Sequence, residues 1–322
     1  VATLLAQDGA EALALIAGEG KAANDFAVTL NAALATDGAN VIVPDGVMLA
    51  KPIEIVHVTT GAVAATSLSR VSIGQGASAR IVESHIGPAG VAYQTNASVR
   101  IDVGSRAQVA YAKLQAEGDQ AIHLGSTTLT VAPKSEVNHL TVTAGAAVSR
   151  SQIFLTTGGE HTRLTLNGAG MIKGKQHADV TLVIDHALPG ANTRVLYKTV
   201  VDDEARGIFQ GRINVWQVAQ KTDAKMMSQA LLLSENAEFD AKPELEIFAD
   251  DVQCGHGATA GQIDATQLFY LMARGVPRAE AEQLLLEAFL DSAIDALGDE
   301  AIATSLKQTV SAWLAKRGGG AA

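Results

Sequence analysis

A cysteine and a histidine two residues apart are the side chains of this 322-residue chain best suited to metal chemistry. Cys254 is the only cysteine, and His256 follows it within a run of small residues that ends at Gly261. Thiolate and imidazole both ligate soft or borderline metals. If a strand continues through this run, side chains two apart share a face and can both reach one ion. Two ligands do not fill a coordination shell, so another chain or molecule would have to supply the rest.

Structural roles remain the alternative for both residues. A buried cysteine can serve as a small apolar side chain, and a histidine can fix a turn through hydrogen bonds. Glu83-x-His85 and Glu160-His161 have no partner motif, and the adjacent Asp250 and Asp251 favour a solvated turn. The remaining histidines show no metal-ligand spacing, so we expect structural roles for His57, His85, His123, His139, His161, His177 and His186.

Two nucleotide-binding motifs can be excluded. Gly255-x-Gly257-x-x-Ala260 formally matches a dinucleotide fingerprint. A Rossmann unit then needs a second strand that ends in an acidic residue about 20 positions on, whereas residues 268–289 have a helical pattern. A P-loop requires Lys-Ser/Thr where this chain has Gln262-Ile263. Any ATP hydrolysis must therefore come from a partner.

Three zones of the chain position these side chains. Residues 1–38 are expected to form a short helical segment, with Phe26, Leu30 and Leu34 on one face and Gly38 as its stop. Residues 40–261 contain short runs that alternate apolar with polar residues, which is typical of strands with one buried face. Residues 262–322 have a helical pattern again and form a C-terminal helical domain.

The middle zone favours a solenoid over hairpins. Similar small-residue turns recur along it, beginning at Gly76, Gly104 and Gly145. The tight Asn-Gly or Asp-Gly turns that hairpins need are scarce after the start of the zone. Stacked Val, Ile and Leu also explain why aromatic residues make up only 4% of a chain that is 48% hydrophobic. The predicted fold class is mainly β, a parallel β-helix with helical ends.

The C-terminal helices have clear boundaries. Asp264 and Gln267 predict a capping box, Arg274-Gly275 a helix end, and Pro277 a new first turn. The second helix is expected to bury Leu284, Leu285, Ala288 and Phe289. The third, about Asp299 to Lys316, is expected to present Ile302, Leu306, Val310 and Trp313. We expect these helices to cap the open end of the solenoid.

Composition excludes several classes of function. A formal charge of −10 argues against a nucleic-acid or anionic-membrane surface, and no apolar run reaches the length of a membrane-spanning helix. One cysteine allows no intramolecular disulfide, and the start has no secretory signal, so a cytoplasmic location is expected.

No catalytic arrangement is evident, and we expect a non-enzyme. The alternative function is a β-helix that binds or cleaves polysaccharides, although two tryptophans and four tyrosines offer few stacking platforms.

A series of blocks between residues 165 and 290 carries a family resemblance. In order they are Gln176-His177-Ala-Asp179, His186-x-x-Pro189, Leu196-Tyr-Lys198-x-Val200, Phe209-Gln-Gly-Arg-Ile213, Ala219-Gln-Lys-Thr-Asp-Ala224, Leu231-Leu-Leu-Ser234, Lys242 to Gly261 and Leu268-Phe-Tyr-Leu-Met-Ala-Arg-Gly275. With these blocks the chain resembles the SufB/SufD family of iron–sulfur cluster assembly scaffolds, and the SufD branch more than SufB. Family members usually have a longer N-terminal helical domain than residues 1–38, so functions of that domain are not carried over.

The resemblance implies a right-handed parallel β-helix within a cytoplasmic complex, where a SufD-like subunit pairs with a SufB-like one and each carries a SufC-like ATPase. It implies that His256 lies at the SufB contact and helps to hold iron or a nascent iron–sulfur cluster, transient and shared with the partner, with Cys254 as a second candidate ligand. The expected ATPase docking element is Leu268, Phe269, Tyr270, Arg274 and Gly275. The sequence does not show whether a flavin takes part or whether the chain alone forms a homodimer.

Overall fold

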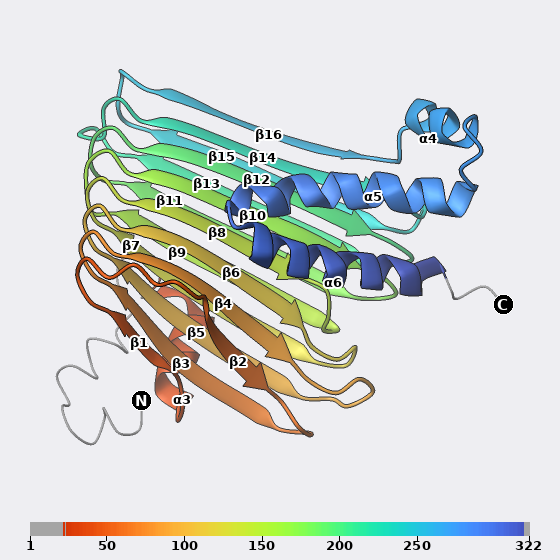
Figure 1. Ribbon diagram of the computed structural model, residues 1–322, viewed down its shortest axis with the longest axis horizontal. Coiled ribbons are helices and arrows are strands. Elements are labelled where there is room, and N and C mark those ends of the chain that lie inside the picture. The colour runs from red at the N-terminus through yellow and green to blue at the C-terminus, as the bar shows by residue number, and fades with distance from the viewer. Residues whose placement is uncertain (1–21, 23, 319–322) are drawn as a thin grey trace.

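Two parallel sheets of eight strands each form the body of the molecule in the computed structural model, which describes residue 22 and residues 24–318 (Figure 1). One sheet contains β1 (Asn40–Val43), β3 (Ala64–Ile73), β5 (Gln94–Val103), β7 (Ile122–Val131), β9 (Val148–Thr157), β11 (His177–His186), β13 (Arg206–Val215) and β15 (Glu238–Ile247). The other contains β2 (Ile53–Val58), β4 (Ser78–Ile86), β6 (Gln108–Ala116), β8 (Glu136–Thr143), β10 (Arg163–Ile172), β12 (Asn192–Val201), β14 (Asp223–Leu232) and β16 (Gln253–Gly261).

The chain alternates between the two sheets, so each pair of consecutive strands makes one rung of a solenoid. Every strand pairs in parallel with the strand two places along. The rungs differ in length. Ile122 pairs with Val148, whereas Arg206 pairs with Glu238, across a longer stretch of chain. The predicted parallel β-solenoid is therefore confirmed.

Aliphatic ladders fill much of the interior. Val43, Ile73, Val103 and Val131 are successive register partners and are all buried. Identical positions on stacked rungs lie about 4.8 Å apart, so branched aliphatic side chains pack directly on one another along the solenoid. A core built this way needs few aromatic residues, as the composition indicates.

The N-terminal helix α3 (Phe26–Leu34) packs on the first sheet with a face that the sequence pattern did not predict. Phe26 is 78% exposed and Leu34 55% exposed. The buried face instead carries Asn31, whose side-chain amide donates to the carbonyl oxygens of Ser67 (2.9 Å) and Asn96 (2.8 Å). These bonds fix the rotation of the helix. Gly38 is not the stop, since the helix ends at Leu34; residues 1–21 lie outside the described residues.

Three helices follow the solenoid: α4 (Ala265–Met272), α5 (Arg278–Ile294) and α6 (Glu300–Gly318), with the short 3-10 helix η2 (Asp295–Leu297) before α6. The Asp264 cap is confirmed, because its carboxylate accepts from the backbone of Thr266 (2.7 Å) and Gln267 (3.1 Å). None of the described helices is both long and apolar enough to span a membrane.

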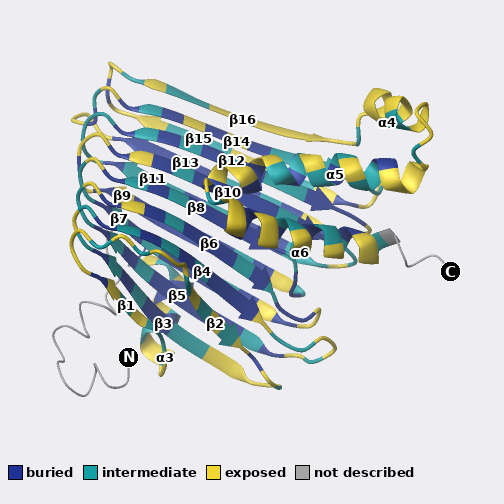
Figure 2. Cartoon of the chain, viewed as in Figure 1, coloured by how far each residue is buried: buried dark blue, intermediate teal, exposed yellow. Residues whose placement is uncertain are grey.

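The prediction that these helices close the end of the solenoid is wrong. Helices α5 and α6 lie across the outer face of the second sheet, and β16 remains uncovered (Figures 1 and 2). Strands β8 and β10 carry apolar residues on both faces, such as Leu140 and Ala169 outward, because both faces are covered. The expected stripe of α5 is also wrong in part. Leu284 and Ala288 are exposed, and the buried positions are Ala281, Leu286, Leu290, Ala293 and Ile294.

Candidate functional site

The last rung leaves two strands at the edge of their sheets. Strand β15 ends the first sheet and β16 ends the second. The backbone N–H of Gln253 donates to Thr222, which precedes β14 (2.9 Å). Because N–H groups of a parallel strand alternate in direction, those of Cys254, His256 and Ala258 point away from β14, toward the open side. The edge of β16 therefore offers free backbone donors.

Cys254 and His256 share one face of β16, as their spacing predicts. Cys254 is the register partner of the buried Ala224, and His256 that of the buried Met226. Both ligand candidates therefore lie on the interior side of the solenoid, at its open end, where Cys254 is half-buried and His256 exposed. They line a groove of about 570 Å³ together with Arg194, Val195, Leu196, Lys225, Met226, Met227, Gln253 and Gly255.

The two candidate ligands differ in their electrostatic surroundings. Burial, reinforced by the negative charge of Asp223, raises the pKa of the Cys254 thiol. The thiol is thus protonated at neutral pH, and a metal would have to displace that proton. Asp223 itself is held by Arg194, 2.7 Å away. The groove supplies one sulfur and one imidazole, and in the described part of the chain no cluster of three metal-ligating groups includes either residue.

The expected docking residues lie on and after α4. No residue of this helix is buried, and Phe269 is 71% exposed. The Arg274 guanidinium lies 3.5 Å from the centre of the Tyr270 ring, and Gly275 takes the left-handed conformation (φ 86°) that turns the chain toward α5. The helix extends beyond the strands and contacts α5 (Figure 1). An exposed aromatic helix held away from the core is typical of a surface that binds a partner.

The glycines of the formal dinucleotide fingerprint lie inside β16. Gly255 and Gly257 are part of the extended strand, paired with Lys225 and Met227 of β14. A dinucleotide site needs these glycines in the turn between a strand and a helix. The sequence-based rejection of this motif agrees with the geometry.

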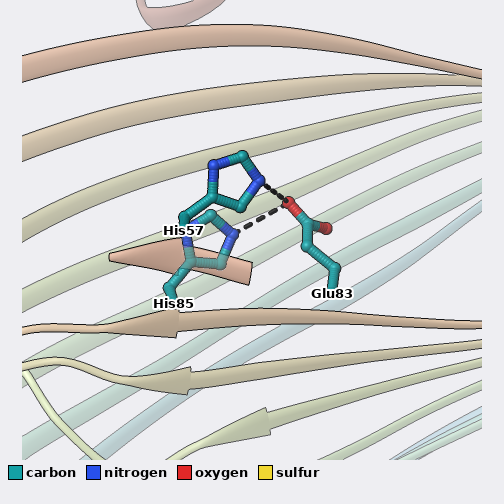
Figure 3. Close-up of side chains that lie close together, drawn as sticks. All are labelled: His57, Glu83 and His85. Atoms are coloured by element: carbon teal, nitrogen blue, oxygen red, sulfur yellow. Dashed lines mark hydrogen bonds and ion pairs between the residues drawn. The ribbon is translucent and has the colours of Figure 1, made fainter. Parts of the chain in front are cut away.

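A cluster of three metal-ligating side chains lies where no sequence motif predicts one. His57, Glu83 and His85 have ligand atoms that all lie within 4.8 Å of one another (Figure 3). His57 and His85 are register partners on the adjacent strands β2 and β4, and their rings stack at 4.4 Å. These two histidines show no metal-ligand spacing in the sequence, yet the fold brings them together. One signal of this pairing was available in the sequence. The first two repeated turns, at Gly76 and Gly104, are as far apart along the chain as His57 and His85.

Fold and site define a parallel β-solenoid with a thiol and an imidazole at an open terminal rung. Residues 57–289 match the family model described as "SUF system FeS cluster assembly, SufBD core domain". The chain belongs to the SufB/SufD family and, through its relatives, to the SufD branch.

The relatives agree with this placement. The chain is 34% identical over 294 residues to the iron-sulfur cluster assembly protein SufD of Escherichia coli (strain K12), covering 89% of this chain and 68% of that protein. It is 30% identical over 322 residues to an iron-sulfur cluster assembly SufBD family protein of Synechocystis, covering 96% and 71%. SufD of Bacillus subtilis is 37% identical over 138 residues, covering 43% and 32%. The chain is thus a SufD-like subunit of iron–sulfur cluster assembly, and nothing in these relatives supports the polysaccharide alternative.

Proposed function

We propose that this chain is a non-enzymatic scaffold subunit, on which a SufB-like partner docks along β16 and completes a metal or cluster site begun by His256 and Cys254. The observation that carries the proposal is the open edge of β16, which presents both candidate ligands in one groove. An edge strand with free donors can accept a strand from another chain. The ligands would then lie at the junction of the two subunits.

The contrast between the two terminal strands supports β16 as the pairing edge. Strand β15 carries charged side chains at alternate positions, from Glu238 to Glu246, and Pro243 stands where a backbone N–H would point outward. Charges and proline on an edge are common protection against pairing. Strand β16 has neither; from Gly257 to Gly261 it contains only Gly, Ala and Thr.

The chemistry of the two ligands suits a site that forms only on assembly. Iron–sulfur clusters are held mainly by thiolates, with histidine as an alternative ligand. The thiol of Cys254 is protonated in the separate chain because burial raises its pKa. A partner that brings iron and further ligands would favour the thiolate, so cluster occupancy should depend on the assembled interface. The cluster is cargo, passed on to acceptor proteins, and leaves the scaffold unchanged.

A SufC-like ATPase would bind the α4 surface formed by Leu268, Phe269, Tyr270, Arg274 and Gly275. The glycines before α4 cannot replace such a partner, because Gln262-Ile263 stands where a P-loop has Lys-Ser/Thr. Movement of ATPase subunits against α4 would pass to the solenoid through β16, because α4 follows that strand directly. We place this assembly in the cytoplasm. A homodimer through β16 is the form proposed for the separate chain.

His256→Ala tests the site. Coexpressed with a SufB-like and a SufC-like subunit, the variant should form the complex normally but bind iron at least about tenfold more weakly, because losing a direct ligand should cost no less than losing an outer-shell partner. Iron and sulfide analysis of the purified complex measures the effect. His177→Ala, at a histidine on β11 that does not line the groove, is the matched control. Unchanged cluster content in His256→Ala would show that His256 is a structural residue, and Cys254→Ala examines the second ligand separately.

A further inference from the structure

We propose that His57, His85 and Glu83 bind a divalent transition-metal ion of the iron-to-zinc series at the first rungs of the solenoid, at the end opposite Cys254. The three side chains come from the neighbouring strands β2 and β4. This site is independent of the partner interface, and the proposal does not rest on the function given to β16.

The geometry of the three ligand atoms fits one ion. Nε2 of His85 lies 2.8 Å from Oε1 of Glu83, and Nε2 of His57 lies 3.7 Å from the same oxygen. Figure 3 shows both imidazoles directed at that oxygen. Ligand atoms that share an ion at bond lengths near 2.1 Å are separated by about 3.0–3.5 Å. The two observed distances lie on either side of this range, so the ion would enter once one of the two stacked imidazoles rotates to bring its lone pair toward the other.

The surroundings hold these groups in place. The hydroxyl of Tyr111 donates to the other oxygen of Glu83, Oε2, at 2.6 Å, which leaves Oε1 directed at the histidines. The His57 and His85 rings are parallel to within 2°, because stacked rungs repeat the side-chain direction. A carboxylate oriented by a further hydrogen bond is a common feature of metal sites.

Two buried nitrogen atoms near the cluster lack hydrogen-bond partners. Nε2 of His57 is one of them. The other is Nε2 of His123, which belongs to β7 of the opposite sheet and has its ring centre 4.7 Å from that of His85. Buried polar atoms are rarely left without a partner, because each costs free energy. A bound ion would satisfy His57 directly, while Glu117 holds the other nitrogen of His123 at 2.8 Å.

The donor set selects the kind of ion. Two imidazoles and one carboxylate suit Zn²⁺, Fe²⁺ or Co²⁺, whereas Ca²⁺ and Mg²⁺ prefer oxygen ligands alone. An ion could enter from the side of the edge strand β2, where the His57 side chain is 22% exposed although its Nε2 atom is buried.

One group opposes the ion. Lys113 is buried and is the register partner of Glu83 on β6, so its ammonium group competes for the same carboxylate. Removing this charge should therefore strengthen metal binding, whereas a purely structural network would gain no affinity for metal.

The test uses the full-length chain without an affinity tag, stripped by a chelator, in a Cys254→Ala/His256→Ala background that removes the other candidate ligands. Titration with Co²⁺ should show one equivalent with visible absorption bands, displaceable by Zn²⁺. His57→Ala should weaken the affinity by at least about tenfold, Lys113→Met should increase it, and His177→Ala should leave it unchanged. Circular dichroism confirms folding of each variant.

Binding that is absent in this background, or equal in the His57→Ala and His177→Ala variants, would overturn the proposal. If His57→Ala does not fold, His57→Gln replaces it, and pulsed electron paramagnetic resonance of Cu²⁺ bound to the background protein counts the coordinated imidazoles. Two imidazoles support the site, and none refutes it. Because Cys254 and His256 are absent throughout, the result is separate from the test of the partner interface.

Discussion

Single buried residues set the response of this protein to acid. His139 lies inside the solenoid, stacked on Tyr111 with ring centres 5.4 Å apart, and neither of its ring nitrogens has a hydrogen-bond partner. Burial lowers its pKa to about 4; the negative charge of Glu83 raises it and the positive charge of Lys113 lowers it further. The native state therefore keeps this ring neutral where the unfolded chain would protonate it.

His139→Phe should reduce the loss of stability in acid. Between pH 6.5 and about 4 the unfolded chain binds a proton at His139 that the native state excludes, so the free energy of unfolding falls as the pH drops through this window. Removing this group should lower the slope by about 1.4 kcal/mol per pH unit, with a remaining slope from other buried histidines. Urea denaturation at pH 6 and pH 5, both inside this window, measures it. A slope no different from that of the His177→Phe control would contradict the assignment.

The candidate ligands at the two ends were not equally predictable. Cys254 and His256 are neighbours in sequence, so strand alternation alone puts them on one face. His57 meets His85 only because the length of the rung between them brings the two into register. Rung length is not constant along the solenoid, so the sequence signals this register only through the equal spacing of the turns at Gly76 and Gly104. Contacts within a strand were therefore directly predictable, whereas contacts between rungs required the rung length to be known.

The helix cap and the buried residues of the last helix agree with the sequence pattern, because local interactions determine them. The Asp264 cap and the buried Ile302, Leu306 and Val310 of α6 agree with prediction. The stripe of α5 shifted because this helix packs against both the second sheet and its neighbour α6, which buries Leu286 and Leu290 in place of Leu284. Helix propensity and periodicity do not specify which neighbour a helix will meet.

Helix α4 should act in docking and contribute little to folding. Phe269→Ser removes an aromatic side chain that touches no core, so the free energy of unfolding should change by no more than about 0.5 kcal/mol. Retention of a SufC-like ATPase in pull-down experiments should nevertheless fall. Phe26→Ser, at an equally exposed aromatic on α3, is the matched control. Equal retention by both variants would exclude α4 as the docking element.

The whole molecule is a stack whose C-terminal end presents two different edges. One sheet ends in the charged β15, which includes Pro243, and the other in the uncharged β16. A partner strand can therefore add to β16 and not to β15, because only one of the two adjacent edges is free to pair.

Ala258→Pro should prevent another chain from pairing with β16, as Pro243 is proposed to do for β15. The N–H of Ala258 points outward, so proline removes a donor needed for pairing with a partner while the ladder to β14 stays intact. We expect loss of the SufB-like partner in size-exclusion chromatography with an unchanged melting temperature. Ala258→Ser retains the N–H and should bind normally. A stable complex with the proline variant would mean that the partner uses another surface.

The stacking of rungs also fixes the distance between the two candidate metal sites. His57 lies on β2 and Cys254 on β16, seven strand steps apart in one sheet, which at a spacing of about 4.8 Å gives roughly 34 Å. No side chain reaches across that distance, so the two ends could not hold one ion between them. Inserting or deleting a complete rung would lengthen or shorten the interval by one step and leave both ends chemically intact. The number of rungs therefore sets the distance between the two candidate sites. Duplication of the segment for one rung would change this distance without altering either site.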